Sequence, residues 1–151
     1  MISGVATGGE GARSFEYGQQ QLRDYLQWDI GTWKHALRYW DTVLAKRPQT
    51  DGPLKALDLG ARDGGLSLYL AQKGFEVVCS DIEGPTERAH ELHAHYGLTE
   101  RITYQAVDAT AIPFEDDCFD VIIFKSILGG IGTFLNYAAI ETAVSEMRRV
   151  L

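Results

Sequence analysis

The chain has no long apolar run. No stretch of the 151-residue sequence approaches the ~20 consecutive apolar residues that a membrane-spanning helix needs. Its N-terminus also lacks a basic segment followed by an apolar one, which is the pattern of an export signal. We therefore expect neither membrane insertion nor export, and a cytoplasmic location.

Basic residues are scarce. Lys and Arg number 14 against 21 Asp and Glu, which gives a formal net charge of −7. The two tight basic pairs, Lys46-Arg47 and Arg148-Arg149, stand at predicted helix C-termini, where positive charge complements the helix dipole. Because nucleic-acid binding relies on clustered cations, this balance argues against a nucleic-acid partner and favours a small-molecule partner.

Metal-binding and disulfide patterns are also absent. The two cysteines, Cys79 and Cys118, lie in or beside predicted strands, so we expect core thiols without a disulfide. Histidines 90, 93 and 95 share one predicted helix, but they lack the i, i+4 pair of a zinc-binding HExxH motif. We expect these histidines to form a solvated face and predict no metal site.

The most informative stretch is residues 54–81. An apolar run carrying Asp58 stops at Gly60, where a loop of small residues opens a helical pattern, and a second apolar run ends at Asp81. Gly74 is the expected C-cap of the helix between them. The pattern predicts a strand, a tight turn, a helix and a second strand.

The end of each strand carries a residue suited to a nucleoside. Gly60 permits a sharp turn and close approach of a ligand to the backbone, and Gly64 and Gly65 are expected to keep the helix entrance equally open. Asp81, 23 residues after Asp58, can accept hydrogen bonds from both ribose hydroxyls. This layout favours an adenosine-containing cofactor at the carboxyl ends of parallel strands.

Two further strands and a helix extend the pattern. Residues 101–107 alternate and lead to Asp108 and Ala109, and residues 119–125 form a continuous apolar run. Pro85 is expected in the first turn of a helix over 85–96, with Gly97 after its end. The fold class predicted is α/β, a doubly wound, Rossmann-like, mostly parallel sheet with strands 54–60, 75–80, 101–107 and 119–125.

The chain divides into three predicted parts: a flexible tail over 1–14, a helical cap over 15–48, and an incomplete cofactor-binding domain over 49–151. The cap begins with a short helical stretch over 19–29, and the helical pattern runs on to Arg47, before Pro48. The six apolar residues expected on one face of this second helix are Trp33, Ala36, Leu37, Trp40, Val43 and Leu44.

The aromatic residues of the cap permit two interpretations. They cover one face of the sheet, or Tyr17, Trp28 or Trp33 forms a lid over the cofactor and part of the substrate pocket. The sequence likewise leaves two roles open for Asp108. Its carboxylate accepts a hydrogen bond from an adenine amine, or it caps a turn.

Four motifs together resemble class I S-adenosylmethionine-dependent methyltransferases: LDLGARDGG, CSDIEG, VDATAIPFEDDCFDVIIFKSILGG and the ending EMRRVL, across about 54–151. The resemblance implies S-adenosyl-L-methionine as cofactor and methyl transfer as the reaction. The acidic balance favours a small-molecule or sugar acceptor over a nucleic acid, and a protein acceptor remains open. The resemblance also assigns positions around the cofactor. The implied residues are Gly60, Ala61 and Arg62 beside the methionine part, Asp81 and Ile82 at the ribose and adenine, Asp108 and Ala109 at the adenine, and Lys125 and Ser126 nearest the methyl group and the acceptor.

The chain departs from the family pattern at two places. Arg62 stands where many members have glycine. At the C-terminus, the family usually continues with a turn such as K-P-G-G and three more strands, so strand 119–125 is expected at a sheet edge. Either the chain is a fragment, or a second copy covers the edge through Val121, Ile122 and Ile123.

Methyl transfer needs little covalent help, and no residue stands out as its catalyst. His35, Asp63 and Glu115 are weak candidates for a general base. A nicotinamide-dependent oxidoreductase also places an acid at Asp81, but the chain lacks G-x-G-x-x-G. A non-catalytic binding or scaffold module on the same fold is the other alternative.

Overall fold

The computed structural model describes residues 16–47, 50–133 and 136–151. A parallel four-stranded sheet with the order β3-β2-β1-β4 forms its centre. This arrangement is the predicted doubly wound, Rossmann-like α/β fold. In chain order, the elements are α1 (Gln19–Leu26), α2 (Ile30–Leu44), β1 (Lys55–Leu59), α3 (Gly65–Gln72), β2 (Glu76–Asp81), α4 (Glu87–His95), a 3-10 turn (Thr99–Arg101), β3 (Ile102–Ala106), β4 (Val121–Phe124), α5 (Ile127–Ile131) and α6 (Tyr137–Val150).

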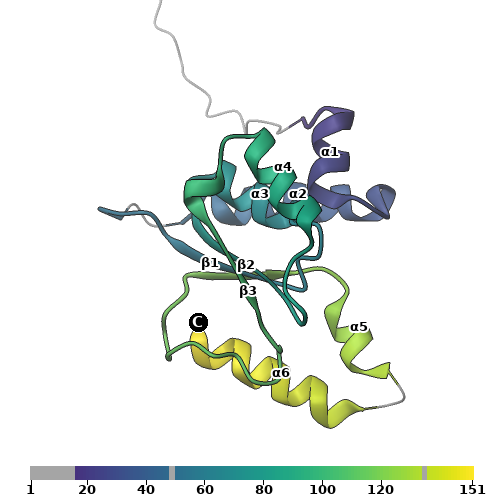
Figure 1. Ribbon diagram of the computed structural model, residues 1–151, viewed down its shortest axis with the longest axis vertical. Helices are drawn as coiled ribbons and strands as arrows, with labels where there is room; N and C mark the ends of the chain where they lie inside the picture. Colours follow the sequence, from purple (N-terminus) through teal and green to yellow (C-terminus); the bar gives the residue numbers. More distant parts are fainter. Residues whose placement is uncertain (1–15, 48–49, 134–135) are drawn as a thin grey trace, which may run out of the picture.

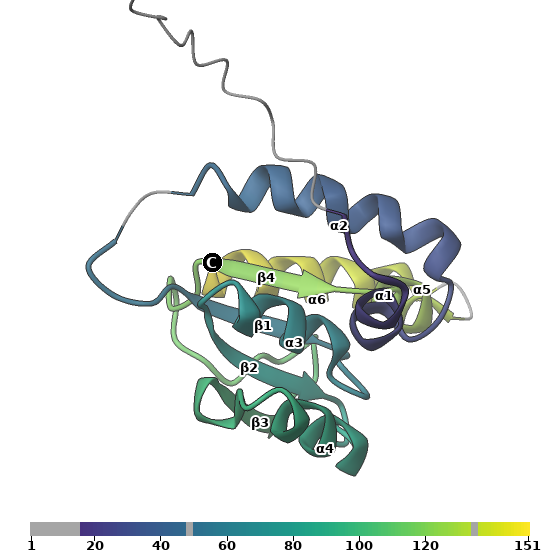
Figure 2. The ribbon, with the colours of Figure 1, turned by 90° about the horizontal axis from the view of Figure 1, so that it is seen from above.

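Helices cover the sheet on both faces. Helices α1 to α4 lie on one side, and α5 and α6 lie on the other (Figures 1 and 2). Each βα connection returns the chain to a parallel strand, so all four strands end at the same edge of the sheet. The loops that follow β1, β2, β3 and β4 are therefore brought together at this edge.

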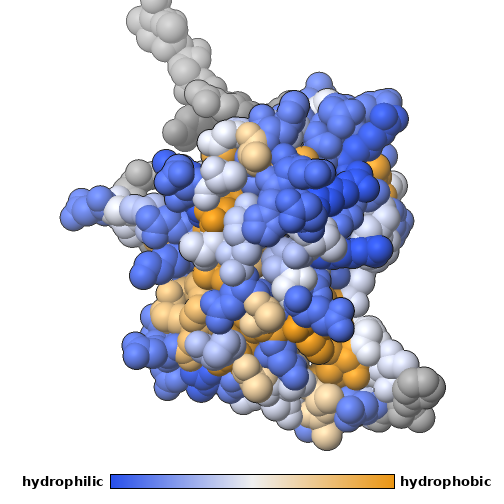
Figure 3. All heavy atoms as spheres, viewed as in Figure 1, coloured by the Kyte–Doolittle hydropathy of each residue, from blue (hydrophilic) through white to orange (hydrophobic). Residues whose placement is uncertain are grey.

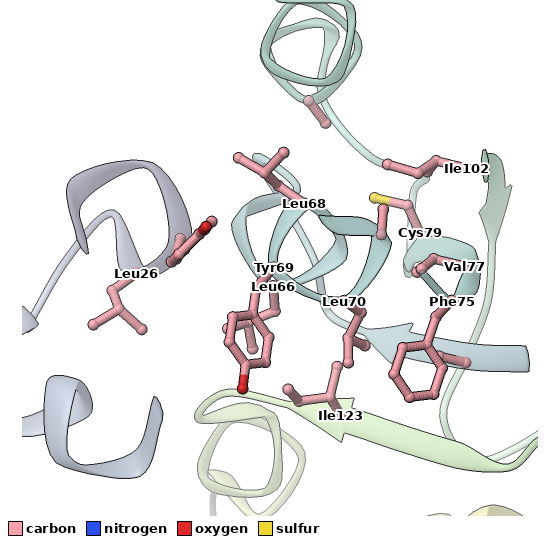
Figure 4. Packing of buried hydrophobic residues seen from close by; sticks show 14 of the residues in the cluster. Leu26, Leu66, Leu68, Tyr69, Leu70, Phe75, Val77, Cys79, Ile102 and Ile123 are labelled. Carbon is pink, nitrogen blue, oxygen red and sulfur yellow. The ribbon is translucent and has the colours of Figure 1, made fainter. Parts of the chain in front are cut away.

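Alternation along the strands separates two apolar cores. In β1 and β2, Ala56, Val77 and Cys79 face the helices α1 to α4, whereas Leu57 and Leu59 face α6. Figure 4 shows the first core, in which α3 packs between α1 and the sheet. Its labelled side chains are Leu26, Leu66, Leu68, Tyr69, Leu70, Phe75, Val77, Cys79, Ile102 and Ile123.

A buried carboxylate joins the N-terminal helices to the domain. Asp41, on α2, is 2% exposed and accepts hydrogen bonds from the Tyr17 hydroxyl at 2.7 Å and the Tyr69 hydroxyl at 2.9 Å. It also forms an ion pair with Lys73. A buried charge is tolerated when it is paired and hydrogen-bonded, as Asp41 is, so this cluster holds α2 against α3.

The C-terminal helix is tied to the loop before β4 by Arg149. Its guanidinium donates to Glu146 within α6, to Asp116, and to the carbonyl oxygens of Phe114 and Ile112, all at 2.8–2.9 Å. The structural role expected of the Arg148-Arg149 pair is thus confirmed for Arg149, although it acts mainly through the neighbouring loop.

Most local predictions hold, with small corrections at helix ends and on one helix face. Gly74 and Gly97 follow α3 and α4 with positive φ, as predicted. Pro85, by contrast, precedes α4, whose N-cap is Thr86. Val43 is 49% exposed, so it does not belong to the buried face of α2. The predicted tail over 1–14 and the proposed stop at Pro48 lie outside the described residues.

Both cysteines are free thiols, as predicted: Cys79 is buried and Cys118 is half-buried. Within the described ranges, no helix is both long enough and apolar enough to cross a bilayer.

Candidate functional site

A cavity of about 410 Å³ opens at the carboxyl ends of the strands. This volume lies within the range of small-molecule sites. The cavity is bordered by the loops after all four strands and by the corner between α1 and α2. All nine residues predicted to contact a cofactor line it: Gly60, Ala61, Arg62, Asp81, Ile82, Asp108, Ala109, Lys125 and Ser126.

The turn after β1 is fixed to the end of β2. Gly60 has φ of +69°, a conformation that glycine adopts without steric cost. The backbone N–H of Ala61 donates to the Ser80 carbonyl at 2.8 Å, and that of Arg62 donates to Asp81 Oδ2 at 2.9 Å. The turn at Gly60 and the Asp81 end of β2 are therefore held together as one unit.

The carboxylate of Asp81 points toward the bend. Its Oδ2 accepts from Arg62, and its Oδ1 accepts from the backbone N–H of Ile82 at 2.8 Å. Each carboxylate oxygen can accept more than one hydrogen bond, so both retain capacity for a ligand. Asp81 is half-buried and lines the cavity. This orientation suits a carboxylate that receives two vicinal hydroxyls.

Asp108 caps the turn after β3, which is one of the two roles that the sequence left open. Its Oδ1 accepts from the Thr110 backbone N–H at 2.8 Å and the Thr110 hydroxyl at 2.7 Å, which closes the turn after β3. These hydrogen bonds hold the pKa of Asp108 below its usual value. The residue also lines the cavity with Ala109 and the 67% exposed Ile82. Turn capping thus orients the carboxylate at the cavity wall.

Lys125 connects the end of β4 to the corner between α1 and α2. Its ammonium donates to the carbonyl oxygens of Leu26 at 2.6 Å and Trp28 at 2.5 Å, and it lies 3.8 Å from the centre of the Trp28 ring. Burial lowers the pKa of Lys125 to about 8, and the charge of Asp29 opposes this shift. Lys125 was expected nearest the acceptor, but its ammonium uses its hydrogen bonds to hold the corner between α1 and α2.

The aromatic residues of the cap have separate roles. Of the three residues named for a lid, Trp28 is the one that lines the cavity. Tyr17 bonds to Asp41 and packs edge-on against Tyr25, and Trp33 packs against Trp40 within the first core and contacts Lys125. Tyr17 and Trp33 do not line the cavity, and their aromatic rings serve the packing of the helices instead.

Asp58 is a site residue that the sequence reasoning missed. It lies in the middle of β1, is 1% exposed, lines the cavity, and accepts from the Ser67 hydroxyl at 2.7 Å. Burial raises the pKa of its carboxyl to about 7, and the Ser67 hydrogen bonds counteract part of this effect. An acid inside an apolar strand was the available signal, because buried carboxyls with shifted pKa values gather at functional sites.

The glycines at the start of α3 make room for protein rather than for ligand. A Cβ on Gly65 would lie 2.2 Å from the Tyr25 carbonyl oxygen, and one on Gly64 would lie 2.6 Å from the His93 ring. The expectation that Gly64 keeps the entrance open for a ligand is therefore wrong, whereas Gly65 lines the cavity although its Cβ position is occupied by α1. They allow α1 and α4 to approach the loop.

His93 corrects the expectation of a solvated histidine face. It is fully buried, with Nε2 2.8 Å from the Gly64 carbonyl oxygen and Nδ1 2.9 Å from the Tyr104 hydroxyl, while His90 stacks on Tyr104. Burial lowers the pKa of His93. A neutral ring that donates from Nε2 and accepts at Nδ1 satisfies both partners, so His93 supports the loop as a polar core residue.

The three weak candidates for a general base, His35, Asp63 and Glu115, do not line the cavity. His35 is exposed on α2, Glu115 is exposed in the loop before β4, and Asp63 accepts from the Thr86 hydroxyl at 2.7 Å. Across the part of the chain that the structure describes, no group of three His, Cys, Asp or Glu side chains is placed to hold a metal ion.

A family model described as "Methyltransferase domain" matches residues 56–151, which include β2, β3 and β4, all of β1 but its first residue, and the predicted cofactor loops. The chain belongs to the class I S-adenosylmethionine-dependent methyltransferase family. S-adenosyl-L-methionine is the cofactor that this family membership implies. The resemblance seen in the four motifs is thereby confirmed.

Named methyltransferases are similar over part of their length. The chain is 33% identical over 114 residues to demethylmenaquinone methyltransferase of Streptomyces avermitilis, covering 75% of this chain and 44% of that protein. It is 39% identical over 71 residues to tocopherol O-methyltransferase of Arabidopsis thaliana, covering 45% and 20%. The chain thus spans less than half the length of these two relatives.

Solved methyltransferase structures share the fold. A putative sarcosine dimethylglycine methyltransferase from Galdieria sulphuraria superimposes with a TM-score of 0.63 at 25% identity, over 82% of this chain and 45% of that one.

The residues at the cavity fit S-adenosyl-L-methionine. The half-buried Asp81 carboxylate presents two oriented oxygens for the ribose hydroxyls, and Asp108 and the apolar side chain of Ile82 stand on the same wall for a flat, amine-bearing base. Gly60, Ala61 and Arg62 line the cavity beside them, although the Cβ position of Gly60 is occupied by the Ile127 side chain. These features match the polar edge and the apolar faces of an adenosyl group.

Proposed function

We propose that the protein transfers a methyl group from S-adenosyl-L-methionine to a small-molecule or sugar acceptor. One observation carries the proposal: the ends of all four strands border a single cavity, in which the Asp81 carboxylate faces the bend at Gly60. Similarity to demethylmenaquinone and tocopherol methyltransferases supports methyl transfer as the reaction.

In this proposal, each loop has a defined task. Asp81 accepts from the ribose hydroxyls, Ile82 and Ala109 pack against the adenine, and the free oxygen of Asp108 accepts from its amine. The backbone from Gly60 to Arg62 runs beside the methionine part. Ser126, at the N-cap of α5, is exposed at the cavity, so its hydroxyl is accessible to a bound molecule.

The cofactor supplies an activated methyl group whose leaving group is neutral. The protein therefore contributes chiefly by holding the two reactants in line and by excluding water. Lys125 donates to the carbonyl oxygens of residues 26 and 28 and so fixes the corner that places Trp28 at the cavity wall. A fixed wall of this kind can hold the reactants in line, and the reaction then needs no dedicated catalytic base.

The acceptor class follows from charge and size. Three acids, Asp58, Asp81 and Asp108, line the cavity, and the chain as a whole carries a formal charge of −7. A nucleic-acid acceptor would be repelled by this field. A volume of about 410 Å³ suits small molecules, and part of it is needed for the cofactor.

Isothermal titration calorimetry with S-adenosyl-L-methionine and with NAD tests the binding step. We expect the first to bind, and we expect Asp81→Asn to weaken it about 10- to 100-fold, because charge-assisted hydrogen bonds to the ribose are lost. The matched control is Glu83→Gln, which removes an exposed acid that does not line the cavity and should leave the affinity unchanged.

Each other outcome has a meaning. Binding of NAD alone would favour an oxidoreductase, and binding of neither ligand would favour a scaffold. Unchanged affinity in Asp81→Asn would rule out the proposed site. Transfer of a labelled methyl group into low-mass compounds, rather than into added polypeptide or RNA, tests the acceptor class.

A further inference from the structure

Arg62 holds a backbone conformation that favours glycine. Its φ is +48°, in the left-handed region where a Cβ is crowded by the following carbonyl. The structure fixes this conformation from both sides, because the Arg62 N–H donates to Asp81 and its carbonyl oxygen accepts from the Thr86 N–H at 3.0 Å. Such outliers gather at functional sites, so a non-glycine residue here directs attention to its side chain.

The side chain of Arg62 is free at the cavity. It lines the wall, is exposed, and makes no hydrogen bond or ion pair with another residue in the described part of the chain. The other cation on the wall, Lys125, donates to two carbonyl oxygens. The guanidinium of Arg62 therefore retains its full set of donors for a ligand.

The charges around it show which ligand it suits. Asp81 and Asp108 give the cavity wall an acidic character, which disfavours any bound anion. A guanidinium on the rim offsets this field at one point and offers a planar fork that pairs with two oxygens at once. Carboxylates and phosphates have the matching geometry.

We propose that Arg62 recognises an anionic group, a carboxylate or a phosphate, of a molecule bound in this cavity. The inference rests on the proposed function. The anion has two sources, the carboxylate of the cofactor's methionine part or an acidic group on the acceptor. In either case, the interaction of the guanidinium with the bound anion compensates for the steric cost of a side chain at a position with positive φ.

Calorimetry with two nucleosides separates the sources. S-adenosylhomocysteine carries the amino-acid carboxylate, and 5′-methylthioadenosine lacks it. If Arg62 binds the cofactor's carboxylate, Arg62→Asn weakens S-adenosylhomocysteine about 10- to 100-fold and leaves methylthioadenosine unchanged. Asn tolerates the left-handed backbone, so the loop is preserved. Arg62→Lys keeps the charge but lacks the planar guanidinium. Its affinity for S-adenosylhomocysteine should therefore lie between those of the natural protein and of Arg62→Asn.

The acceptor source gives a different pattern. Both nucleosides then bind Arg62→Asn as they bind the natural protein, while inorganic phosphate or benzoate titrated into the S-adenosylhomocysteine complex binds the natural protein at least about tenfold more tightly. Arg88→Gln is the control, because Arg88 is exposed on α4 and does not line the cavity. It should change none of these affinities.

The outcomes distinguish this inference from the function beneath it. If the natural protein binds neither nucleoside, the proposed function fails, and the role of Arg62 fails with it. If it binds both and Arg62→Asn alters neither nucleoside nor anion binding, the role of Arg62 alone is overturned. Thermal unfolding of Arg62→Gly should show equal or greater stability, which separates a loss of affinity from a loss of fold.

Discussion

Asp58 places a carboxyl group inside the sheet, directly beneath the cavity. Burial raises its pKa from 3.8 to about 7, because the ionised form is poorly solvated there. Between these two values, the folded protein retains a proton that the unfolded chain releases. Stability therefore decreases as pH rises from about 4 to about 7, and the full penalty is present above that range.

Asp58→Asn tests this linkage. The amide oxygen can still accept from Ser67, but the side chain no longer titrates. We expect the variant to gain stability relative to the natural protein as pH rises, by on the order of 3–4 kcal/mol between pH 4 and pH 8. Urea unfolding at several pH values measures the difference. A constant difference at all pH values would show that the Asp58 carboxyl ionises normally.

At the residue scale, the sequence predicted the groups that depend on local pattern. Asp81 and Asp108 end alternating apolar runs, so their place at strand tips followed from periodicity alone. The roles of Gly64 and His93 did not follow, because each is defined by a partner that is distant in sequence. His93 meets Gly64 across 29 positions. No helical pattern reveals that a histidine on a polar helix reaches a loop so far away.

At the scale of elements, α1 depends on a close approach to α3. A Cβ atom on Gly65 would lie 2.2 Å from the carbonyl oxygen of Tyr25, so α1 occupies the space that a side chain would need. Leu26 and Tyr25 are buried against this surface. The corner that follows has positive φ at Gln27 and Asp29, so α1 and α2 are joined by a tight, specific bend. Placement of α1 thus sets the position of Trp28 at the cavity.

Gly65→Ala should displace α1. Because backbone rather than a flexible side chain occupies the space, we expect a loss of about 2 kcal/mol or more of unfolding free energy, comparable to overpacking a core. Weaker cofactor binding should accompany it. Gly31→Ala is the control: nothing lies within 4 Å of its Cβ position, and alanine favours helix, so it should be neutral or stabilising. Equal thermal stability of the two variants would contradict the close approach.

The elements themselves were largely predictable. The four strands lie within the predicted ranges or one residue beyond them, because apolar runs bounded by glycine and acids are strong local signals. The short helix α5 was not predicted, because it contains Gly129 and Gly130, and glycine disfavours helix. Val43 was placed wrongly on the buried face of α2, because periodicity cannot show where the neighbouring surface ends.

At the scale of the whole molecule, β4 is paired on one side only within the described residues. Its composition is that of a central strand, yet Val121, Ile122 and Phe124 are only half-buried. On the opposite side of the molecule, the one that carries β3, apolar side chains form a separate band between the sheet and α6 (Figures 2 and 3). We propose that the 151-residue chain, studied alone, covers its β4 edge with a second copy.

Sedimentation and amide hydrogen exchange test this association. We expect a dimer that dissociates on dilution, together with concentration-dependent protection of amides in 121–124, because strand pairing shields them. The amides of β1, paired on both sides, serve as the internal control and should stay protected at every concentration. A monomer at all concentrations with rapidly exchanging β4 amides would contradict the pairing.

The cavity mouth joins residues 25–28 to residues 125–131 through Lys125, which bonds to a carbonyl oxygen 99 positions earlier. A ribosome delivers the first of these segments long before the second. The cavity mouth can therefore assemble only after β4 and α5 have emerged. A nascent chain that ends before them carries the turn at Gly60 and the acid at Asp81 without the part of the wall that Lys125 and α5 supply.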